Sequence, residues 1–343
     1  MISTLSYGLD EVDERAWNQL LSTCKPDIHN IYQTLEWATL LEKVYGYEPG
    51  FLLTCNGSKP VAGHLIFRKR VARHLSARES AGGPLSNGSL IYETLQEECD
   101  LFLQERRLSV YTRLRPISSP GVDDVFIRKG YVKCPLFTYI LRLDKPEEVL
   151  WKEIARSARG RVKKAVQNGV CVAEALDWQD WIRFYHLHYK HSRNKGITPK
   201  SQQFFEMLYT TLLPRGMVKL FVASLRGHVI GGMLFFIFQG TMTHYISSSS
   251  KEDLEHCPSD LIMWHAIQWG AKSGIRYLDL GDTQPDPDSH LYGIHRFKEK
   301  WGGELINRSL YVRGKIYVLG YSAVNVSRRS QRVYEFINRH GLL

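Results

Sequence analysis

The chain has 343 residues, a formal net charge of +10 and 43% hydrophobic residues. This is an ordinary globular composition, and it excludes a disordered chain, a collagen-like repeat and a disulfide-rich mini-protein. The length exceeds what one hydrophobic core comfortably fills, so two domains are expected. No apolar window is long enough to predict a transmembrane helix, and residues 1–10 lack the pattern of a signal peptide. The six cysteines form no Cys-x-x-Cys motif, which indicates reduced thiols and a cytoplasmic location.

The excess positive charge belongs to the second half of the chain. Residues 1–150 carry 18 basic and 19 acidic side chains, whereas residues 151–343 carry 27 basic and 16 acidic ones. Three basic runs account for much of this excess: Lys152, Arg156, Arg159, Arg161, Lys163 and Lys164; Arg296, Lys298 and Lys300; Arg328, Arg329, Arg332 and Arg339. Such a half attracts tRNA, CoA phosphates or an anionic membrane surface, although solvated helix faces are the simpler alternative. No DNA-reading motif accompanies the charge, so sequence-specific DNA binding is not expected.

The first half begins with a predicted β-hairpin. Residues 51–70 consist of two apolar runs around Asn56 and Gly57, which is the pattern of two strands and a tight turn. Downstream, the sequence predicts a helix over 92–107, a strand over 109–116 and a closing strand within 127–143.

Residues 143–170 predict a helical connection between the halves. Asp144 is expected to cap the first helix, because a proline and two glutamates follow in its first turn. Gly169 follows an asparagine and is a typical helix C-terminal signal. Gly160 is expected to divide the segment into two helices.

The second half repeats the order of the first. Residues 220–239 lie over residues 51–70 without a gap, so that Gly232 falls on Gly63. A helix over 259–273 and strands over 275–282 and within 297–313 then follow, as in the first half. We infer a duplicated α/β (α+β) unit, in which a mixed, mostly antiparallel sheet is flanked by helices. The predicted domains are residues 1–145 and 146–343, and the second includes the basic helical segment 146–169.

A resemblance to a known family rests on five segments in a fixed order. They are RGRVKKAVQNGV (159–170), HYKHSRNKGI (188–197), HYISSSS (244–250), SDLIMWHAIQWGAKSGIRYLDLGD (259–282) and GIHRFKEKWGG (293–303). This order resembles the FemAB-type transferases, which are built from two GNAT (N-acetyltransferase-like) folds. The Gly-x-x-x-Phe-Lys-x-x-Trp-Gly pattern is its most specific element. The resemblance implies transfer of an aminoacyl group from aminoacyl-tRNA to an amine of a peptidoglycan precursor, or of an acyl group from acyl-CoA.

Lys298 is the first candidate catalytic residue. It lies beside Phe297 and near Trp301, so part of its surroundings is expected to be dry. A lysine there can stabilise negative charge on a carbonyl oxygen or grip the donor, whereas a lysine in an exposed basic loop is the alternative. The resemblance implicates this lysine in the transfer step and makes Phe297 and Trp301 candidate substrate contacts. Asp279 ends a predicted buried strand, where α/β folds often place catalytic groups, although it could instead tie a neighbouring loop.

Arg193 and Tyr245 are candidate acceptor-binding residues. The arginine fork suits bidentate recognition of phosphate or carboxylate, and the resemblance implies that the arginine of this segment helps to hold the acceptor. The Tyr245 ring could pack on substrate, but a core tyrosine is the alternative. His186, His188 and His191 do not line one helix face, so no metal site is assigned.

A loop in the first half is the other candidate acceptor contact. Gly82 and Gly83 before Pro84 allow close backbone approach and amides that face an anion. The resemblance implies that such a loop contacts a nucleotide-linked acceptor. Two positions depart from the family: Gly83 stands where a basic residue is usual, and Leu41 stands where a lysine is expected four residues after Trp37.

The donor is expected to carry phosphate, and no cofactor is expected to be tightly bound. Arg159, Arg161, Lys163 and Lys164 are candidate contacts to donor phosphate or RNA. Ordinary acetyl-CoA enzymes of this fold hold pyrophosphate with a glycine-rich loop at a helix N-terminus. The equivalent residues 252–260 are acidic and lack glycine, which favours aminoacyl-tRNA over acyl-CoA.

Three functions follow in order of preference. The first is transfer from aminoacyl-tRNA to an amine of a cell-wall precursor, whose carrier could be a nucleotide or a lipid. The second is acyl-CoA-dependent N-acylation of a sugar or small amine. The third is a non-catalytic protein that binds RNA or touches a membrane surface, because a fold alone does not prove activity.

Overall fold

The computed structural model describes residues 2–23, 30–57, 59–72, 75–86, 108–115, 122–289 and 291–314. The predicted helix over 92–107 and the basic run near the C-terminus lie outside these ranges. The chain forms two compact units, one of residues 1–136 and 307–343 and the other of residues 137–306. Each is described by itself.

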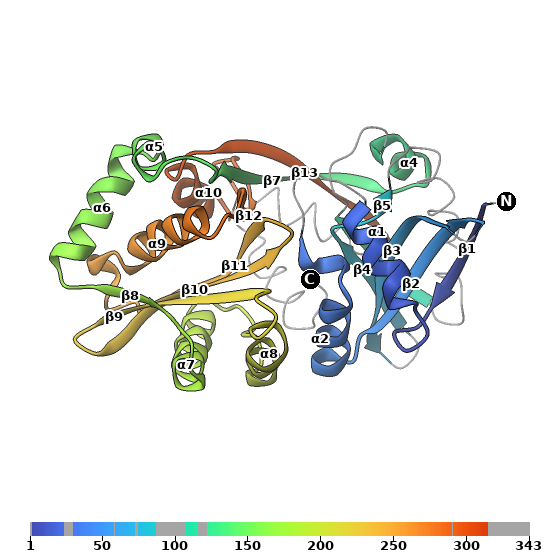
Figure 1. Ribbon diagram of the computed structural model, residues 1–343, viewed down its shortest axis with the longest axis horizontal. Helices are drawn as coiled ribbons and strands as arrows, with labels where there is room; N and C mark the ends of the chain where they lie inside the picture. Colours follow the sequence, from blue (N-terminus) through green and yellow to red (C-terminus); the bar gives the residue numbers. More distant parts are fainter. Residues whose placement is uncertain are drawn as a thin grey trace. The chain divides into compact units, whose positions relative to one another are not determined.

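The first unit is a sheet with helices packed on it (Figure 1). Its strand order is β1–β2–β3–β4–β6–β13, and β5 pairs with β3. The strands are β1 (Ile2–Tyr7), β2 (Glu48–Asn56), β3 (Lys59–Ala72), β4 (Leu75–Ala81), β5 (Leu85–Ser86), β6 (Leu108–Arg115) and β13 (Glu304–Arg313); the helices are α1 (Glu14–Thr23), η1 (Ile31–Gln33), α2 (Leu35–Tyr45) and α4 (Val122–Arg128). β2 and β3 form the predicted antiparallel hairpin, whereas β4 and β6 run parallel.

The second unit has the same order of elements. Its strands follow the order β7–β12–β11–β10–β9–β8. They are β7 (Val132–Arg142), β8 (Cys171–Glu174), β9 (Val218–Leu225), β10 (His228–Phe238), β11 (Thr241–Ser249) and β12 (Tyr277–Thr283); the helices are α5 (Glu147–Glu153), α6 (Arg156–Gln167), α7 (Trp178–Asn194), α8 (Gln202–Met207), η2 (Leu208–Leu212), η3 (Leu254–His256), α9 (Pro258–Lys272) and α10 (Tyr292–Glu299). The sheet is antiparallel except that β11 and β12 run parallel, as β4 and β6 do.

Two glycines show the duplication in three dimensions. In the first unit, a Cβ atom on Gly63 would lie 2.8 Å from the Trp17 ring of α1. In the second, a Cβ atom on Gly232 would lie 2.4 Å from the Phe184 ring of α7. Gly63 and Gly232 are the residues that the gapless alignment superimposes. Each lets a helix press an aromatic ring onto the central hairpin, which confirms the predicted twin-domain fold.

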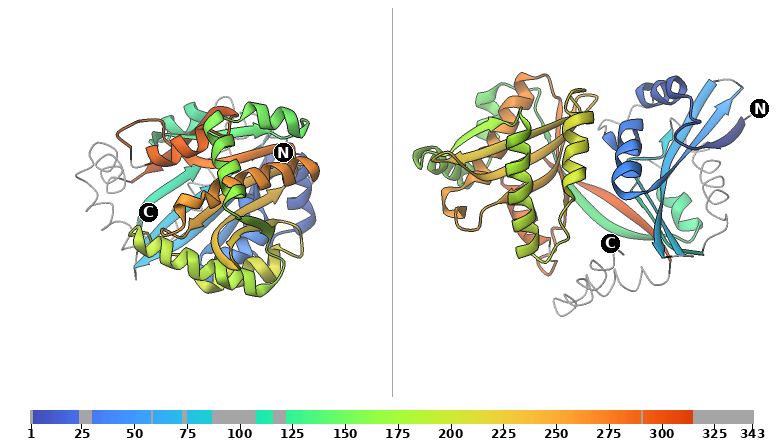
Figure 2. Two further views of the ribbon diagram at one scale, coloured as in Figure 1. Left: turned by 90° about the vertical axis from the view of Figure 1, so that its left-hand side faces the viewer. Right: turned by 90° about the horizontal axis from the view of Figure 1, so that it is seen from below.

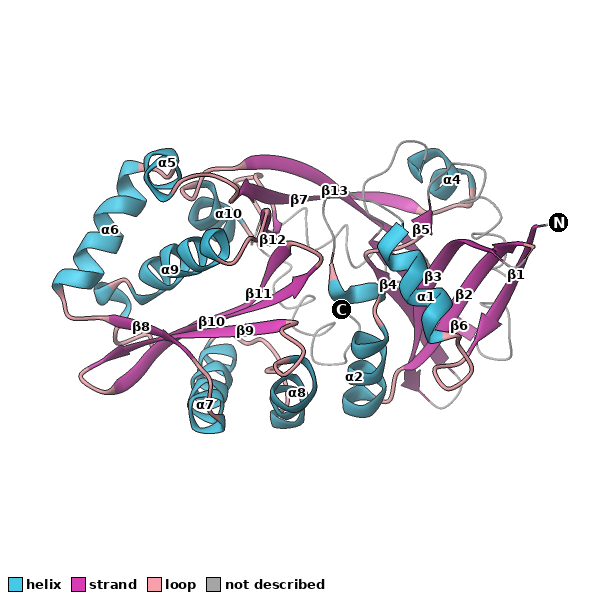
Figure 3. Ribbon diagram, in the orientation of Figure 1, coloured by secondary structure: helices cyan, strands magenta, loops and turns pink. Residues whose placement is uncertain are grey.

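Helices cover both faces of the second sheet. In Figure 1, α7 and α8 lie on one face and α9 and α10 on the other; Figure 2 shows α7 and α8 in front of the strands when seen from below, and Figure 3 shows the same layers by element type. Neighbouring glycines of β10 confirm the two faces. A Cβ atom on Gly232 would meet Phe184 of α7, whereas one on Gly231 would lie 3.1 Å from Pro258 of α9. One hydrophobic core of the second unit lies on the α9 face.

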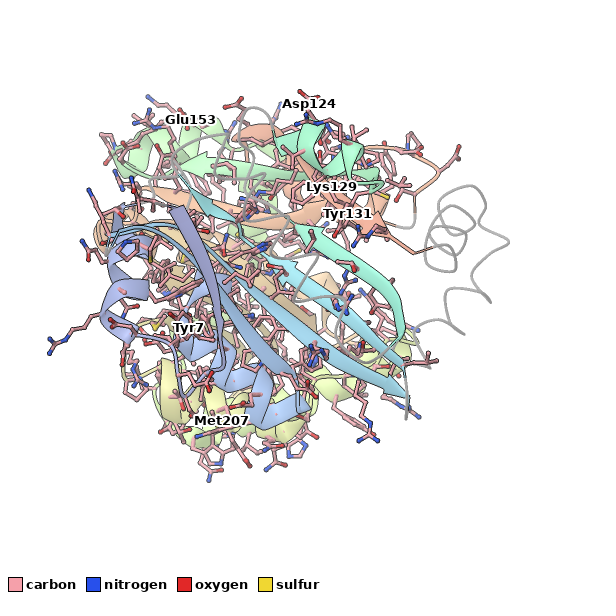
Figure 4. All side chains as sticks on the ribbon, turned by 90° about the vertical axis from the view of Figure 1, so that its right-hand side faces the viewer. Tyr7, Asp124, Lys129, Tyr131, Glu153 and Met207 are labelled. Atoms are coloured by element: carbon pink, nitrogen blue, oxygen red, sulfur yellow. The ribbon has the colours of Figure 1, made fainter. Side chains whose placement is uncertain are left out.

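The predicted boundary between residues 145 and 146 differs from the structure, because the two repeats exchange their last strands. The end of β13 pairs with β6, where Tyr311 lies opposite Leu114, and the end of β7 pairs with β12. Arg313 of β13 donates to the carbonyl oxygen of Lys129 at 3.3 Å and lies over the Tyr131 ring at 4.8 Å. Lys129 and Tyr131 are labelled where α4 leads into β7 (Figure 4). A single cut in the sequence cannot describe this exchange.

The break in the helical connection lies six residues before the predicted one. Gly160 is inside α6, and the chain leaves helical geometry at Ile154, where α5 ends. There the Ala155 amide donates to the carbonyl oxygen of Lys300 at 2.8 Å. Arg159 Nη1 donates to the Ile154 carbonyl oxygen at 2.5 Å and so satisfies the end of α5. Tertiary contacts, rather than a local glycine, set the break.

The ends of this segment give one wrong prediction and one correct one. Pro146, rather than Asp144, is the residue at which α5 begins, and it makes no side-chain cap bond. Asp144 instead forms an ion pair with Arg142 at 2.6 Å. Gly169 follows α6 with a φ of +79°, the left-handed conformation that a glycine after a helix supplies.

Candidate active site

The candidate site lies where β11 and β12 stop pairing. Their parallel register ends at Thr243 and Asp279, although both strands continue. On its other side, β12 bulges away from β7 between Asp279 and Asp282. Gly281, inside the bulge, has a φ of +75°, which glycine adopts without strain. The carboxyl end of parallel strands is a common place for ligands in open α/β sheets.

Lys298 of α10 points into the bulge. Only 5% of the residue is exposed, and Nζ donates to the carbonyl oxygen of Asp282 at 2.7 Å. Burial lowers the pKa of Lys298 from 10.5 to about 8, against the opposing attraction of the Asp282 and Asp279 charges. The lysine is therefore still mostly charged at pH 7 and poorly hydrated. A cation of this kind is suited to stabilise negative charge that develops on a carbonyl oxygen.

Asp279 is bonded to the scaffold. Its Oδ1 accepts from Thr138 Oγ1 at 2.6 Å and from the Gly281 amide at 2.9 Å, and the residue is 1% exposed. Thr138 Oγ1 also lies 2.9 Å from the carbonyl oxygen of Gly281. These hydrogen bonds hold the bulge in place. The carbonyl oxygen of Asp282, at the end of the bulge, accepts the hydrogen bond from Lys298. This geometry favours a structural role for Asp279 over direct proton transfer, so Asp279 is better described as a positioning residue.

His244 of β11 was missed by the sequence reasoning. Its Nδ1 lies 3.4 Å from the carbonyl oxygen of Leu280, and its buried Nε2 has no hydrogen-bond partner among the residues that the structure describes. Burial, followed by the charge of Lys298, lowers the pKa of His244 to about 3, so the ring is neutral. A Cβ atom on Gly281 would lie 3.0 Å from the His244 carbonyl oxygen and 3.6 Å from Lys298 Nζ. The available signal was the histidine that directly precedes Tyr245 in the motif HYISSSS.

Tyr245 and Lys298 lie on opposite faces of the sheet. The Tyr245 ring is 4.6 Å from that of Phe236 and 6.1 Å from that of Phe204, and Lys200 Nζ lies 5.8 Å over it. These partners belong to the α7 and α8 face, whereas Lys298 comes from α10. The contacts favour the alternative reading of Tyr245 as a packing residue, and the structure does not bring it to Lys298.

The other residues of the predicted substrate site divide by burial. Trp301 is 1% exposed, and its ring lies 6.0 Å from that of the half-buried Phe297, so Trp301 packs in the core rather than facing a substrate. Lys300 Nζ lies 4.4 Å over the Phe297 ring. Arg193 is exposed at the end of α7.

The four predicted phosphate-binding residues have different surroundings. Arg159 is engaged with the end of α5, as described above. Arg161 Nε donates to Asp260 Oδ2 at 2.9 Å, and Lys300 forms a second ion pair with the same carboxylate. Lys163 and Lys164 are exposed on α6. These two lysines are the members of the set best placed to meet a polyanion in solvent.

The glycine-proline loop of the first unit is built around Gln33. Gln33 Nε2 donates to the Ala81 carbonyl oxygen at 2.7 Å, and the Gly82 amide donates to the carbonyl oxygen of Arg115 at 2.8 Å. A Cβ atom on Gly83 would lie 2.7 Å from Gln33 Oε1 and would also meet the His64 ring at 2.7 Å. Gly83 stands where a basic residue is usual in the family, and the structure gives a steric reason, because no side chain fits at this position. Gly83 and Pro84 are joined by a cis peptide bond.

The histidines of α7 tie the helix to β11. His188 Nε2 accepts from the Lys200 amide at 3.2 Å, and its Nδ1 contacts Ser248 Oγ at 3.1 Å. His191 Nδ1 contacts the Ser249 carbonyl oxygen at 3.0 Å. In the described ranges, no three His, Cys, Asp or Glu residues come together as metal ligands, and none of the helices there is long and apolar enough to cross a membrane.

Comparisons with known sequences agree with this architecture. Residues 152–299 match the model of the Acetyltransferase (GNAT) domain. The chain is 21% identical to the Lipid II:glycine glycyltransferase of Staphylococcus saprophyticus subsp. saprophyticus, over 51% of this chain and 57% of that relative. The enzyme of the same name from Staphylococcus aureus is 21% identical over 51% of this chain and 58% of its own length. The chain thus spans little more than half of the relatives that it matches.

Solved structures match over more of the chain. The crystal structure of FemX has a TM-score of 0.74 and 14% identity, and the match covers 94% of this chain and 100% of FemX. A tandem GNAT protein from the clavulanic acid biosynthesis pathway has a TM-score of 0.59 and 11% identity, covering 91% of this chain and 98% of that protein. The matched domain and the fold define the class: residues 152–299 are a GNAT domain, and the chain has a tandem GNAT fold. Within that class, the chain is similar to the FemAB-type transferases.

Proposed function

We propose that the chain transfers an aminoacyl group from aminoacyl-tRNA to an amine of a cell-wall precursor. The observation that carries the proposal is the buried cation of Lys298, held against the Asp282 carbonyl where β11 and β12 separate. A poorly hydrated ammonium in that place is useful to a reaction that develops negative charge on an oxygen atom.

The reaction is a direct displacement. The lone pair of a neutral acceptor amine attacks the ester carbonyl of the donor, and a C–N bond forms while negative charge collects on the carbonyl oxygen. Lys298 stabilises this charge. The C–O ester bond then breaks, its electron pair leaves with the donor oxygen, and a proton lost by the amine ends on that oxygen. A well-positioned neutral amine needs only modest help from a base.

The acceptor class follows from the relatives. They are named as glycyltransferases that act on lipid II, and the matched GNAT domain of residues 152–299 includes the candidate site. We infer a lipid-linked cell-wall precursor with a free amine as the acceptor, and glycine as the first donor group to test. Exposed Arg193 and the loop at Gly82, Gly83 and Pro84 remain the proposed acceptor contacts.

The first turn of α9 supports tRNA over CoA as the donor. Asp260 lies in that turn, its side chain is 3% exposed, and it is paired with both Arg161 and Lys300. The Asp260 carboxylate thus neutralises the positive N-terminus of α9 and two cationic side chains, which a pyrophosphate would otherwise bind. Exposed Lys163 and Lys164 on α6 are then proposed contacts to the RNA backbone. The match to an acetyltransferase domain keeps an acyl-CoA-dependent N-acyltransferase as the second candidate.

The test supplies both donors to the same purified chain. Radiolabelled glycyl-tRNA with lipid II, and radiolabelled acetyl-CoA with lipid II or glucosamine, are compared for label in the product. Lys298→Met is expected to lower transfer by about 100-fold or more, as for loss of one oxyanion-stabilising group. The control is Lys272→Met, which removes a lysine whose side chain is 72% exposed. Transfer from acetyl-CoA alone would replace the tRNA proposal with the second candidate.

A further inference from the structure

His244 carries an unused hydrogen-bond acceptor beside Lys298. A carbonyl oxygen can only accept, so the ring nitrogen that faces the Leu280 carbonyl, Nδ1, is the one that carries hydrogen. The neutral ring then has a lone pair on Nε2. No described residue supplies a donor to that nitrogen, although it is enclosed by protein. Buried acceptors of this kind are rare and call for an explanation such as a ligand or an ordered water.

The position of His244 points to a ligand near the reacting atoms. The residue directly follows the last paired position of β11, Thr243, so it lies where the two parallel strands separate. Its ring packs against Phe235 at 5.3 Å, on the α9 face of the sheet, from which Lys298 also approaches. Gly281 touches both residues, since its missing Cβ would lie close to the His244 carbonyl oxygen and to Lys298 Nζ.

Two protein groups could compete for Nε2. One is Lys298, but its Nζ is bonded to the carbonyl oxygen of Asp282. The other is the Ile246 backbone, whose hydrogen bonding to the ring raises the pKa of His244 and is the smallest of the influences on it, but which lies outside hydrogen-bond geometry with Nε2. Neither group satisfies the nitrogen in this arrangement.

We propose that His244 Nε2 accepts a hydrogen bond from the attacking amine of the acceptor and so points the amine lone pair at the carbonyl carbon held by Lys298. This rests on the proposed function and adds a substrate-contacting residue to it. An amine with two N–H groups can donate one of them to Nε2 while its lone pair forms the new C–N bond. The departing ester oxygen receives the proton that the amine loses, so His244 begins and ends the step neutral. Its low pKa suits this role, because the ring remains an acceptor at neutral pH.

The experiment uses three substitutions that separate the two ring nitrogens. His244→Gln keeps an acceptor near the Nε2 position, His244→Asn keeps a donor near Nδ1, and His244→Phe keeps only the ring shape. Transfer of glycine from glycyl-tRNA to lipid II is measured for each at varied lipid II. We expect His244→Phe and His244→Asn to lose about tenfold in kcat/KM for lipid II, consistent with one lost hydrogen bond, and His244→Gln to stay within about threefold of the wild type.

A spectroscopic readout separates contact with substrate from a structural role. In a 15N-histidine-labelled chain, Nε2 of His244 should report an unprotonated nitrogen whose resonance moves when lipid II is added. A lipid II analogue with a trimethylated amine, which has no N–H to donate at any pH, should leave the resonance unmoved. Lys272→Met is the matched control for general effects of substitution.

Every result bears on the proposal. Equal losses in all three variants, a protonated Nε2, or an equal shift with the trimethylated analogue would overturn the role of His244. A pH profile that moves in His244→Gln while kcat/KM at pH 7 is kept would assign Nε2 to Lys298 instead. If the wild type transfers no glycine from glycyl-tRNA, the proposed function fails, whereas glycine transfer without sensitivity to His244 removes the inference alone.

Discussion

Replacing Lys298 with methionine is expected to stabilise the protein at pH 7. The folded state lowers the pKa of this lysine from 10.5 to about 8, because the charged form loses its hydration in the core. A difference of this size corresponds to about 3 kcal/mol of unfolding free energy at a pH below both values. Methionine has a similar length and no charge to desolvate, but it cannot make the hydrogen bond that Lys298 donates to the carbonyl oxygen of Asp282, at a cost of about 1 kcal/mol. The net gain is about 2 kcal/mol.

The pH dependence follows from the direction of the pKa change. Above pH 10.5 the lysine is neutral in both states, and the wild type bears no charge penalty. As the pH falls from 10.5 to about 8, the unfolded chain binds the proton first, so the wild type loses stability over this window. Below about pH 8 both states are charged and the full penalty remains. The advantage of Lys298→Met is therefore largest at pH 7 and falls by about 2 kcal/mol at pH 9.5.

The assay is urea unfolding followed by tryptophan fluorescence at pH 7 and 9.5. Trp301 is buried three residues from the substitution, so the signal includes the affected region. Lys272→Met serves as the control, and its difference from the wild type should not change between the two pH values. If Lys298→Met is less stable than the wild type at pH 7, or its advantage is constant with pH, the argument from desolvation is refuted.

Three further substitutions test the scaffold of the two units by urea unfolding. Gly281→Ala should cost about 3 kcal/mol, because its φ is unfavourable for alanine and the new methyl group would lie 3.0 Å from the His244 carbonyl oxygen. The control Gly130→Ala has a similar φ but open space around the methyl group, and it should cost about 1 kcal/mol. Equal costs for the two variants would refute the steric contribution. Asp260→Asn should cost about 3 kcal/mol, mainly by leaving Lys300, whose side chain is 15% exposed, without its carboxylate; an unchanged midpoint would show that the ion pairs of Asp260 do not stabilise the fold. Gln33→Leu should cost about 2 kcal/mol by breaking the bonds that hold the glycine-proline loop, and a neutral effect would show that the loop is held by other contacts.

Local patterns predicted the elements and their repetition well. The hairpin over 51–70 consists of two apolar runs around a turn, and residues 220–239 lie over it without a gap. The register that superimposes Gly63 on Gly232 follows from a steric need at both positions. The exchange of β7 and β13 was not predictable in this way. It depends on which strands pair across long distances in the sequence, and either repeat read by itself looks complete.

The site was predictable in its main residue and not in its geometry. Lys298 was found because the Phe-Lys pattern resembles that of the family, and because Phe297 beside it and Trp301 near it indicate a partly dry environment. The separation of Tyr245 from Lys298 depends on which face of a strand each contacts, and that requires the tertiary packing. His244 was missed because its interest lies in the tautomer that the Leu280 carbonyl selects and in an unused lone pair. Residue type alone carries neither property.

The strand exchange between the repeats limits how the two repeats can be separated in evolution. A gene fragment that encodes one repeat alone would leave β6 or β12 as an open sheet edge, with unpaired backbone groups that invite aggregation. We therefore expect a repeat that is produced separately to fold only if another strand covers this edge. Once the duplicated copies had traded their closing strands, selection could alter the chemistry of one copy while the other was retained as its obligatory folding partner.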